Sequence, residues 1–205
     1  MKRKDKILTT ALSLFNQHGI ESISLKAIAK NLEISYGNVT YHFPNKHKLV
    51  AQLYNNMLTA HHAVLEHFQE TDQLLESIIL APLQTFKISL EYRFLFVDVV
   101  AIKRKYTTII EQQSAGNQQQ MQQLLPLFEQ LKLDGFLRQE VSKEQILFLM
   151  QASNAIRTFF FINLDESTIV YSKTLEQAYL KQVNQLLWPY LSPQGIEIYK
   201  QLIPD

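Results

Sequence analysis

The segment Ser24–Phe43, SLKAIAKNLEISYGNVTYHF, constrains this 205-residue chain more than any other feature. Apolar residues in its first half recur at i, i+3, i+4 and i+7, which is the spacing of one buried helix face. These residues are Leu25, Ile28, Ala29 and Leu32. The hydroxyl of Ser24 can accept a hydrogen bond from a free amide at the helix start. The pattern therefore predicts a short, capped helix that packs against another element.

The second half of the segment predicts another short helix after a tight turn. Ile34 can fill the turn, and Ser35 can cap a helix that runs from about Tyr36 to Phe43. Gly37 weakens an isolated helix by roughly 1 kcal/mol relative to alanine, but it lets the backbone approach another surface closely. Together the two halves predict a helix-turn-helix, whose second helix enters the major groove of DNA.

Other residues in the first fifty positions follow the pattern of a known family, in order and without gaps. They are Lys6-Ile7-Leu8, Ala11-Leu12, Leu14-Phe15, Gly19, Ser24, Ile28-Ala29, Ile34-Ser35, Gly37, Tyr41-His42-Phe43, Lys46 and Leu49. This series resembles the N-terminal domain of the TetR family of transcriptional regulators. Beyond this series, the chain resembles the family only in its length and in its all-helical sequence pattern. The resemblance implies a homodimer that binds double-stranded operator DNA and releases it when a small molecule enters the C-terminal domain.

The resemblance also indicates which residues would contact DNA. The predicted DNA-binding residues are Lys26, Ser35, Tyr36, Gly37, Asn38, Thr40, Tyr41, His42 and Lys46. We expect Tyr36, Asn38 and Lys26 to contact base edges, whereas the residues from Thr40 onward and the basic N-terminal arm hold phosphates. Position 40 is often Tyr in the family and is Thr here, so Tyr41, His42 and Lys46 would supply more of the contact with the DNA phosphate backbone.

Charge is distributed unevenly along the chain. Residues 1–50 contain eight basic and three acidic residues, a net charge of +5, whereas the remaining 155 residues contain twelve basic and sixteen acidic residues, a net charge of −4. Phosphate neutralisation would require positive charge at the end that contains the helix-turn-helix. The alternative, a merely solvated charged surface, does not predict this segregation.

Helical periodicity continues to the end of the chain, which predicts an all-α fold. We expect a three-helix DNA-binding domain over residues 1–47, followed by a helical ligand-binding and dimerisation domain over residues 48–205. Pro44 ends the second short helix, and a long helix begins near Lys46 and carries apolar residues as far as Phe68. Further helices are predicted at about 73–90, 92–105, 106–133, 142–163, 168–190 and 193–202. The glutamine-rich stretch 112–123 reads as a polar helix face or an exposed loop without an assigned function.

Aromatic residues in the C-terminal region exceed what a minimal core needs, so several could line a ligand cavity. The candidate pocket residues are Phe86, Tyr92, Phe96, Phe128, Asn154, Arg157 and Phe160. Apolar walls with few polar groups favour an effector that is mostly hydrophobic, although its identity stays unknown. The alternative for each aromatic residue is ordinary packing in the core.

Two apolar stripes predict how copies of the chain would associate. The stripes lie on the expected helices 142–163 and 168–190, and each covers enough of its helix to form a four-helix bundle with a second copy. A two-fold dimer suits two DNA half-sites about 34–36 Å apart. The alternative is that both stripes close a core within one chain.

Other function classes find little support in the sequence. The chain contains no cysteine, which excludes disulfides and cysteine-ligated zinc and fits a reducing cytoplasm, and no leader or membrane-spanning pattern is present. His62 and Glu66 share a helix face, but two ligands are too few for a metal site. Because no phosphate-binding loop, nucleophile elbow or zinc-protease motif occurs, we expect neither a cofactor nor enzymatic activity. A transcriptional activator, a ligand-independent regulator, a metal-dependent enzyme and a protein-interaction domain remain as alternatives.

Overall fold

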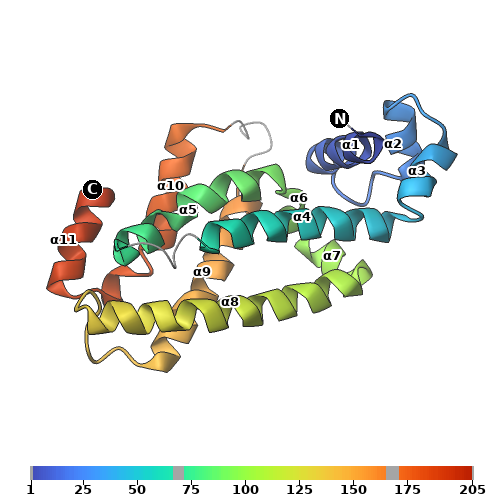
Figure 1. Cartoon of the computed structure of the whole chain (residues 1–205). Coiled ribbons are helices and arrows are strands. Elements are labelled where there is room, and N and C mark those ends of the chain that lie inside the picture. Colours follow the sequence, from blue (N-terminus) through green and yellow to red (C-terminus); the bar gives the residue numbers. More distant parts are fainter. Residues whose placement is uncertain (1, 67–71, 165–170, 205) are drawn as a thin grey trace. The chain divides into compact units, whose positions relative to one another are not determined.

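The computed structural model describes residues 2–66, 72–164 and 171–204, and Figure 1 shows their helices. The elements of this part of the chain are helices, and its one extended pairing is an isolated antiparallel bridge between Leu137 and Leu191. The expected all-α fold is confirmed. The chain divides into two compact units, the first made of Met1–Ala60 and Glu91–Ser114 and the second of His61–Leu90 and Ala115–Asp205.

The first unit contains seven helical segments of the described chain. They are α1 (Arg3–His18), α2 (Leu25–Asn31), α3 (Tyr36–His42), the start of α4 (Lys46–Glu66), α6 (Phe94–Val97), α7 (Val99–Lys105) and the start of α8 (Thr107–Leu133). Its apolar core includes Phe15, Ile28, Val39, Leu49 and Phe94, each no more than 3% exposed. The core therefore joins side chains of the N-terminal helices to a side chain from the later segment 91–114.

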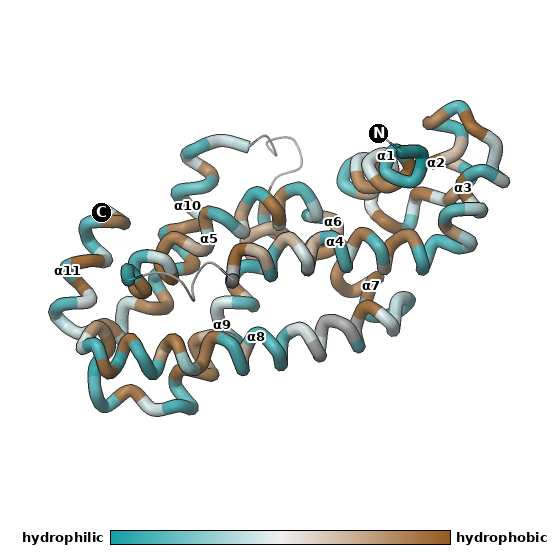
Figure 2. Tube along the Cα trace, in the orientation of Figure 1, coloured by the Kyte–Doolittle hydropathy of each residue, from teal (hydrophilic) through white to brown (hydrophobic). Residues whose placement is uncertain are grey.

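The second unit is built from the later parts of α4 and α8 and from the remaining helices. These are α5 (Leu74–Glu91, without its last residue), α9 (Lys143–Ile162), α10 (Lys173–Asn184), a 3-10 turn (Trp188–Tyr190) and α11 (Pro193–Leu202). Brown residues along α5 are interrupted by teal ones in Figure 2, as expected for a helix that buries one face. The side-chain Nδ2 of the buried Asn184 donates to the carbonyl of Ile79 at 2.8 Å and to the carbonyl of Leu180 at 3.0 Å. The bond to Ile79 links α10 to α5.

An aromatic cluster forms a separate part of this second core. Phe86 lies with its ring centroid 5.0 Å from Tyr179 and 5.9 Å from Phe161, and the centroids of Phe160 and Tyr179 are also 5.0 Å apart. Ring pairs at these separations stabilise a core beyond the area that they bury. The cluster fastens α5, α9 and α10 together.

Two expected helices differ from the sequence-based prediction. The range 92–105 is two helices, α6 and α7, which meet at Asp98 because its backbone leaves the helical conformation there. The range 168–190 contains the shorter α10, followed by turns and the 3-10 segment that includes Pro189. Phe68 and positions 168–170, where the sequence predicts helix, lie outside the described residues. None of the helices that the structure describes is long and apolar enough to cross a membrane.

Candidate nucleic-acid interface

The helix-turn-helix is held by local hydrogen bonds. Ser24 Oγ accepts from the amide of Ala27 at 3.1 Å, and Ser35 Oγ accepts from the amide of Asn38 at 3.2 Å, so both short helices are capped as expected. Between them, Glu33 adopts a left-handed conformation with a φ of 54°, and the amide of Ile34 donates back to the Ala29 carbonyl at 3.0 Å. These bonds end α2 and reverse the chain before α3 begins.

The outer face of α3 is exposed to solvent. Tyr41 is 84% exposed and Tyr36 is 46% exposed, while Val39 on the opposite face is fully buried. Gly37 and Asn38 are exposed between the two tyrosines. Both tyrosine side chains are therefore accessible to solvent on this short helix. The buried Val39 and Phe43 fix α3 against its own unit.

The polar side chains of this face are not equally available. Asn38 Nδ2 donates to Ser35 Oγ at 3.0 Å, which leaves its side-chain oxygen and its second N–H for another partner. The Thr40 hydroxyl lies 3.2 Å from the carbonyls of both Tyr36 and Gly37, so it bonds back to its own helix. Lys26 Nζ lies 5.8 Å from the ring centroid of Tyr36, within range of a cation–π interaction.

Lys46 occupies a different position from the other predicted contact residues. Its ammonium donates to the carbonyl of Ile20 and lies 5.6 Å from the ring centroid of Phe15. Burial lowers the pKa of Lys46, and the negative charge of Glu21 opposes part of that effect. The side chain is therefore half-buried and fastens the start of α4 to the loop after α1.

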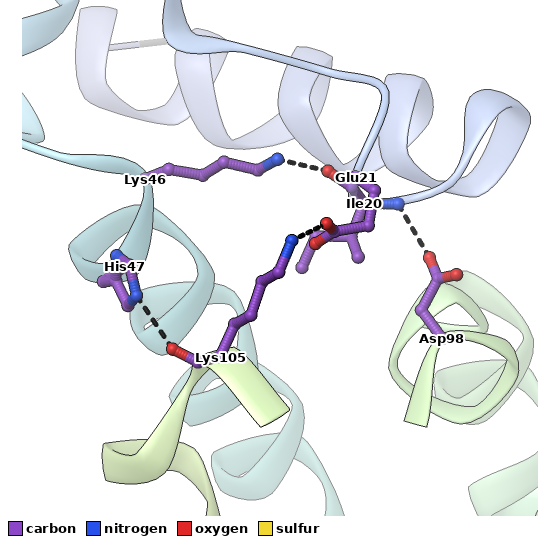
Figure 3. Close-up of polar contacts among 6 residues, drawn as sticks. All are labelled: Ile20, Glu21, Lys46, His47, Asp98 and Lys105. Carbon is purple, nitrogen blue, oxygen red and sulfur yellow. Dashed lines mark hydrogen bonds and ion pairs between the residues drawn. The ribbon is translucent and has the colours of Figure 1, made fainter. Parts of the chain in front are cut away.

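A polar junction joins that loop to α7 within the first unit (Figure 3). Asp98 Oδ2 accepts from the amide of Ile20 at 2.7 Å, Lys105 forms an ion pair with Glu21, and His47 Nε2 lies 2.9 Å from the carbonyl of Lys105. The hydrogen bond from Lys105 is the main reason that the pKa of Glu21 is lowered. These bonds fix the residues that lead into α2.

A second polar junction lies at the end of α1. Asn16 accepts from the amide of Phe94 at 3.0 Å and donates to the carbonyl of Glu91 at 2.7 Å, and Arg93 donates to the carbonyl of Asn16 at 2.5 Å. Sequence reasoning missed both junctions, because the partners lie up to 84 residues apart and no motif links them.

The candidate ligand residues separate into three groups. Phe128, Asn154 and Arg157 line a cavity of about 250 Å³ in the second unit, together with residues that the sequence had not indicated, such as Thr85 and Met121. Phe86 and Phe160 pack against each other in the aromatic cluster, with centroids 6.3 Å apart. Tyr92 and Phe96 belong to the first unit. Within the described residues, no group of three or more His, Asp or Glu side chains is placed to hold a metal ion.

Comparison with known proteins identifies the family of the chain. Residues 7–53 match the model of "Bacterial regulatory proteins, tetR family", and residues 56–199 match the TetR model described as "Bacterial transcriptional repressor". The chain is 33% identical over 63 residues to the probable HTH-type transcriptional regulator YttP of Bacillus subtilis, a match of 31% of this chain and 30% of that protein. It is 29% identical over 126 residues to the HTH-type transcriptional regulator UidR of Escherichia coli, a match of 53% of this chain and 61% of UidR.

Solved structures share the fold over nearly the whole chain. A TetR-family transcriptional regulator from Marinobacter aquaeolei is 23% identical and has a TM-score of 0.84, with 100% of both chains covered. The ketosteroid transcriptional regulator KstR2 of Mycobacterium tuberculosis is 15% identical and has a TM-score of 0.72, with 93% of this chain and 96% of that chain covered. The relatives are transcriptional regulators and not enzymes. This chain belongs to the TetR family of bacterial transcriptional regulators.

Proposed function

We propose that the protein is a dimeric repressor that binds operator DNA through α2 and α3. The observation that carries this proposal is the exposed outer face of α3, where Tyr36 and Tyr41 flank Gly37 and Asn38. The net charge of +5 over residues 1–50 supplies the attraction to phosphates. A protein that acts on the chromosome in this way works in the cytoplasm.

Individual residues take distinct roles in the proposed complex. Tyr36, Asn38 and Lys26 contact base edges, and the amide of Asn38 is suited to the paired donor and acceptor groups of adenine. Tyr41 and His42 hold phosphates together with the basic residues at the start of α1. Thr40 contributes less to the phosphate contact, because its hydroxyl already has carbonyl partners in α3.

Lys46 has two functions in the proposed complex: it binds the Ile20 carbonyl and it contacts a phosphate. One of its three N–H donors is used by the Ile20 carbonyl, so two donors remain for a phosphate at the end of α3. Because Lys46 lies at the start of α4, it would link a contact with the DNA phosphate backbone to the loop that precedes α2.

Dimerisation is proposed to use α9 and α10. On α9, Phe148, Ala155, Phe159 and Ile162 are exposed and recur at i, i+7, i+11 and i+14, which places them on one helix face. Phe148 is 64% exposed and Phe159 is 57% exposed, more than expected for large side chains of a helix that packs only within its own chain. A second copy of this face would cover them.

Release from DNA is proposed to follow binding of a small, largely apolar molecule in the cavity of the second unit. Helix α4 contributes residues to both units, so a ligand that favours one position of α4 would change the separation of the two α3 helices in the dimer. Such coupling typically amounts to about 1–3 kcal/mol between two states.

The proposal is tested by selecting duplexes from a random library with the purified full chain and measuring their affinity by fluorescence anisotropy. We expect affinity for the selected duplexes to fall steeply between about 50 and 200 mM salt, as phosphate contacts require. Expression of a reporter behind the selected sequence, with and without the protein, separates repression from activation. Absence of salt-dependent binding to any duplex would refute the proposed function.

A further inference from the structure

The cavity of the second unit has one charged side chain on its wall. The wall is formed from α4, α5, α8, α9 and α10, and among its described residues Arg157 is the single charged one. The rest of the wall is apolar, as at Ile78, Leu124 and Val183, or carries neutral polar groups, as at Asn184. None of the described residues that line the cavity carries a carboxylate.

Arg157 also has no acidic partner elsewhere among the residues that the structure describes. Its guanidinium donates to Thr85 Oγ1 at 3.1 Å, and the ion pairs of the described chain involve other residues. The side chain is half-buried. A guanidinium has five N–H donors, so beside its bond to Thr85 it has donors to offer a ligand in the cavity. A partly buried charge without a counter-ion is unfavourable, and a bound anion would compensate it.

A neighbouring histidine does not alter this charge balance. Burial, with a smaller contribution from the positive charge of Arg157, lowers the pKa of His61 to about 4, so His61 is neutral near pH 7. Ser89 Oγ lies 3.4 Å from His61 Nε2, which gives the imidazole a neutral partner. The positive charge beside the cavity is therefore that of Arg157 alone among the described groups.

We infer that this cavity binds a small amphiphilic acid, whose carboxylate pairs with Arg157 and whose apolar body lies against α5 and α8. The planar guanidinium favours a carboxylate, because it can form two parallel hydrogen bonds to one. The volume of about 250 Å³ lies just below the range of about 300–1,000 Å³ for small-molecule pockets, so the acid is compact. This inference rests on the proposed function, because it names the chemical class of the effector.

The test compares three probes that share one chain and differ in the head group: octanoate, octanol and octylamine. Binding to the full-length protein is measured by isothermal titration calorimetry at pH 7.5. We expect octanoate to bind at least ten times more tightly than octanol, and octylamine to bind least. Equal affinities for the acid and the alcohol, or no binding of any probe, would overturn the inference.

Variants assign the preference to Arg157. In Arg157→Gln, octanoate should lose at least ten-fold in affinity while octanol is unchanged, and Arg157→Lys should keep part of the preference for the acid. Arg104→Gln is the matched control, because Arg104 is exposed on α7 in the other unit. If Arg157→Gln loses affinity for octanoate and octanol equally while its circular dichroism spectrum is unaltered, Arg157 has a packing role and the inference is overturned. If Arg157→Gln does not fold, Arg157→Lys and the wild-type probe series still decide.

DNA binding of the same preparations keeps this inference separate from the proposed function. Salt-dependent DNA binding without any preference for octanoate would refute the acid site and leave the DNA-binding proposal intact. An octanoate preference that depends on Arg157, without DNA binding to any duplex, would support the acid site and refute the proposed repressor.

Discussion

The carboxylate of Asp98 accepts a hydrogen bond from the backbone amide of Ile20 at 2.7 Å, across 78 residues of sequence. The same carboxylate lies 3.6 Å from the place where a Cβ of Gly19 would be, and Gly19 has a φ of 75°. The chain after α1 thus turns in a conformation that favours glycine and is held there by a charged acceptor from the junction of α6 and α7. This contact fixes the segment that leads into α2.

We expect Asp98→Ala to destabilise the first unit. A hydrogen bond to a charged group contributes about 1.5–3 kcal/mol, and its loss also leaves the part-buried Ile20 amide without an acceptor. Hydrogen exchange measured by NMR should show faster exchange at Ile20 and across α2. Glu129→Ala provides the control, because Glu129 is an exposed carboxylate on α8 in the second unit. Unchanged protection of Ile20 in Asp98→Ala would show that another group holds this turn.

The parts of the structure that the sequence predicts correctly depend on local signals. Ser24 and Ser35 cap helices within three residues of themselves, and the apolar face of α2 repeats within about two turns, so a short stretch of sequence contains the full pattern. The hydrogen bond that Asp98 accepts could not be predicted in this way, because its donor is an amide 78 residues earlier. Similarly, Phe86 and Phe128 are both buried aromatic residues, and only the fold places one in a packed cluster and the other on a cavity wall.

Asn38→Ala is expected to relax base preference more than it lowers overall affinity. Asn38 is exposed on α3, and its amide retains an acceptor oxygen and a second N–H beside the bond to Ser35. One base contact of this type discriminates against a wrong base by about 1–3 kcal/mol. Selection of bound DNA with the variant should therefore lose preference at one position of each half-site. Equal losses on selected and random duplexes would contradict a base contact.

Lys46→Gln should weaken binding to every duplex by a similar factor. If its remaining donors contact a phosphate, the slope of log affinity against log salt falls by about 1. Lys200→Gln is the control for loss of one positive charge, because Lys200 is exposed in the second unit. A variant that loses affinity with an unchanged salt slope would restrict Lys46 to its internal contact with Ile20.

Phe159→Glu should shift the protein from dimer to monomer. Phe159 lies on the exposed apolar face of α9 and is 57% exposed, so a carboxylate there is tolerated in the single chain but would be buried without a partner in the proposed dimer. Sedimentation velocity measures the shift, and affinity for a two-half-site duplex should fall with it. Leu133→Glu is the matched control, because Leu133 is 79% exposed at the end of α8. A Phe159→Glu variant that sediments as the wild type does would place any dimer contact elsewhere.

His61 should make the second unit less stable in acid. Its ordinary pKa of about 6.5 applies to the unfolded chain, whereas burial lowers the pKa to about 4 in the folded chain. Between these values the unfolded chain binds a proton that the folded chain does not, so the free energy of unfolding decreases as the pH falls from about 6.5 to about 4. The difference between the two pKa values corresponds to a decrease of up to about 3 kcal/mol in the free energy of unfolding. Above pH 6.5 this decrease does not occur, because the histidine is neutral in both states.

This dependence is measured by urea unfolding at pH 7.5 and pH 4.5, followed by the fluorescence of Trp188, the single tryptophan, which lies in the second unit. In His61→Gln the loss of stability between these pH values should be smaller than in the wild type by up to about 3 kcal/mol, because the titrating group is gone. His18→Gln removes an exposed histidine of the first unit and should reproduce the wild-type loss. Identical losses in all three proteins would mean that His61 is already protonated in the folded chain at pH 4.5, and hence that its imidazole is accessible to water.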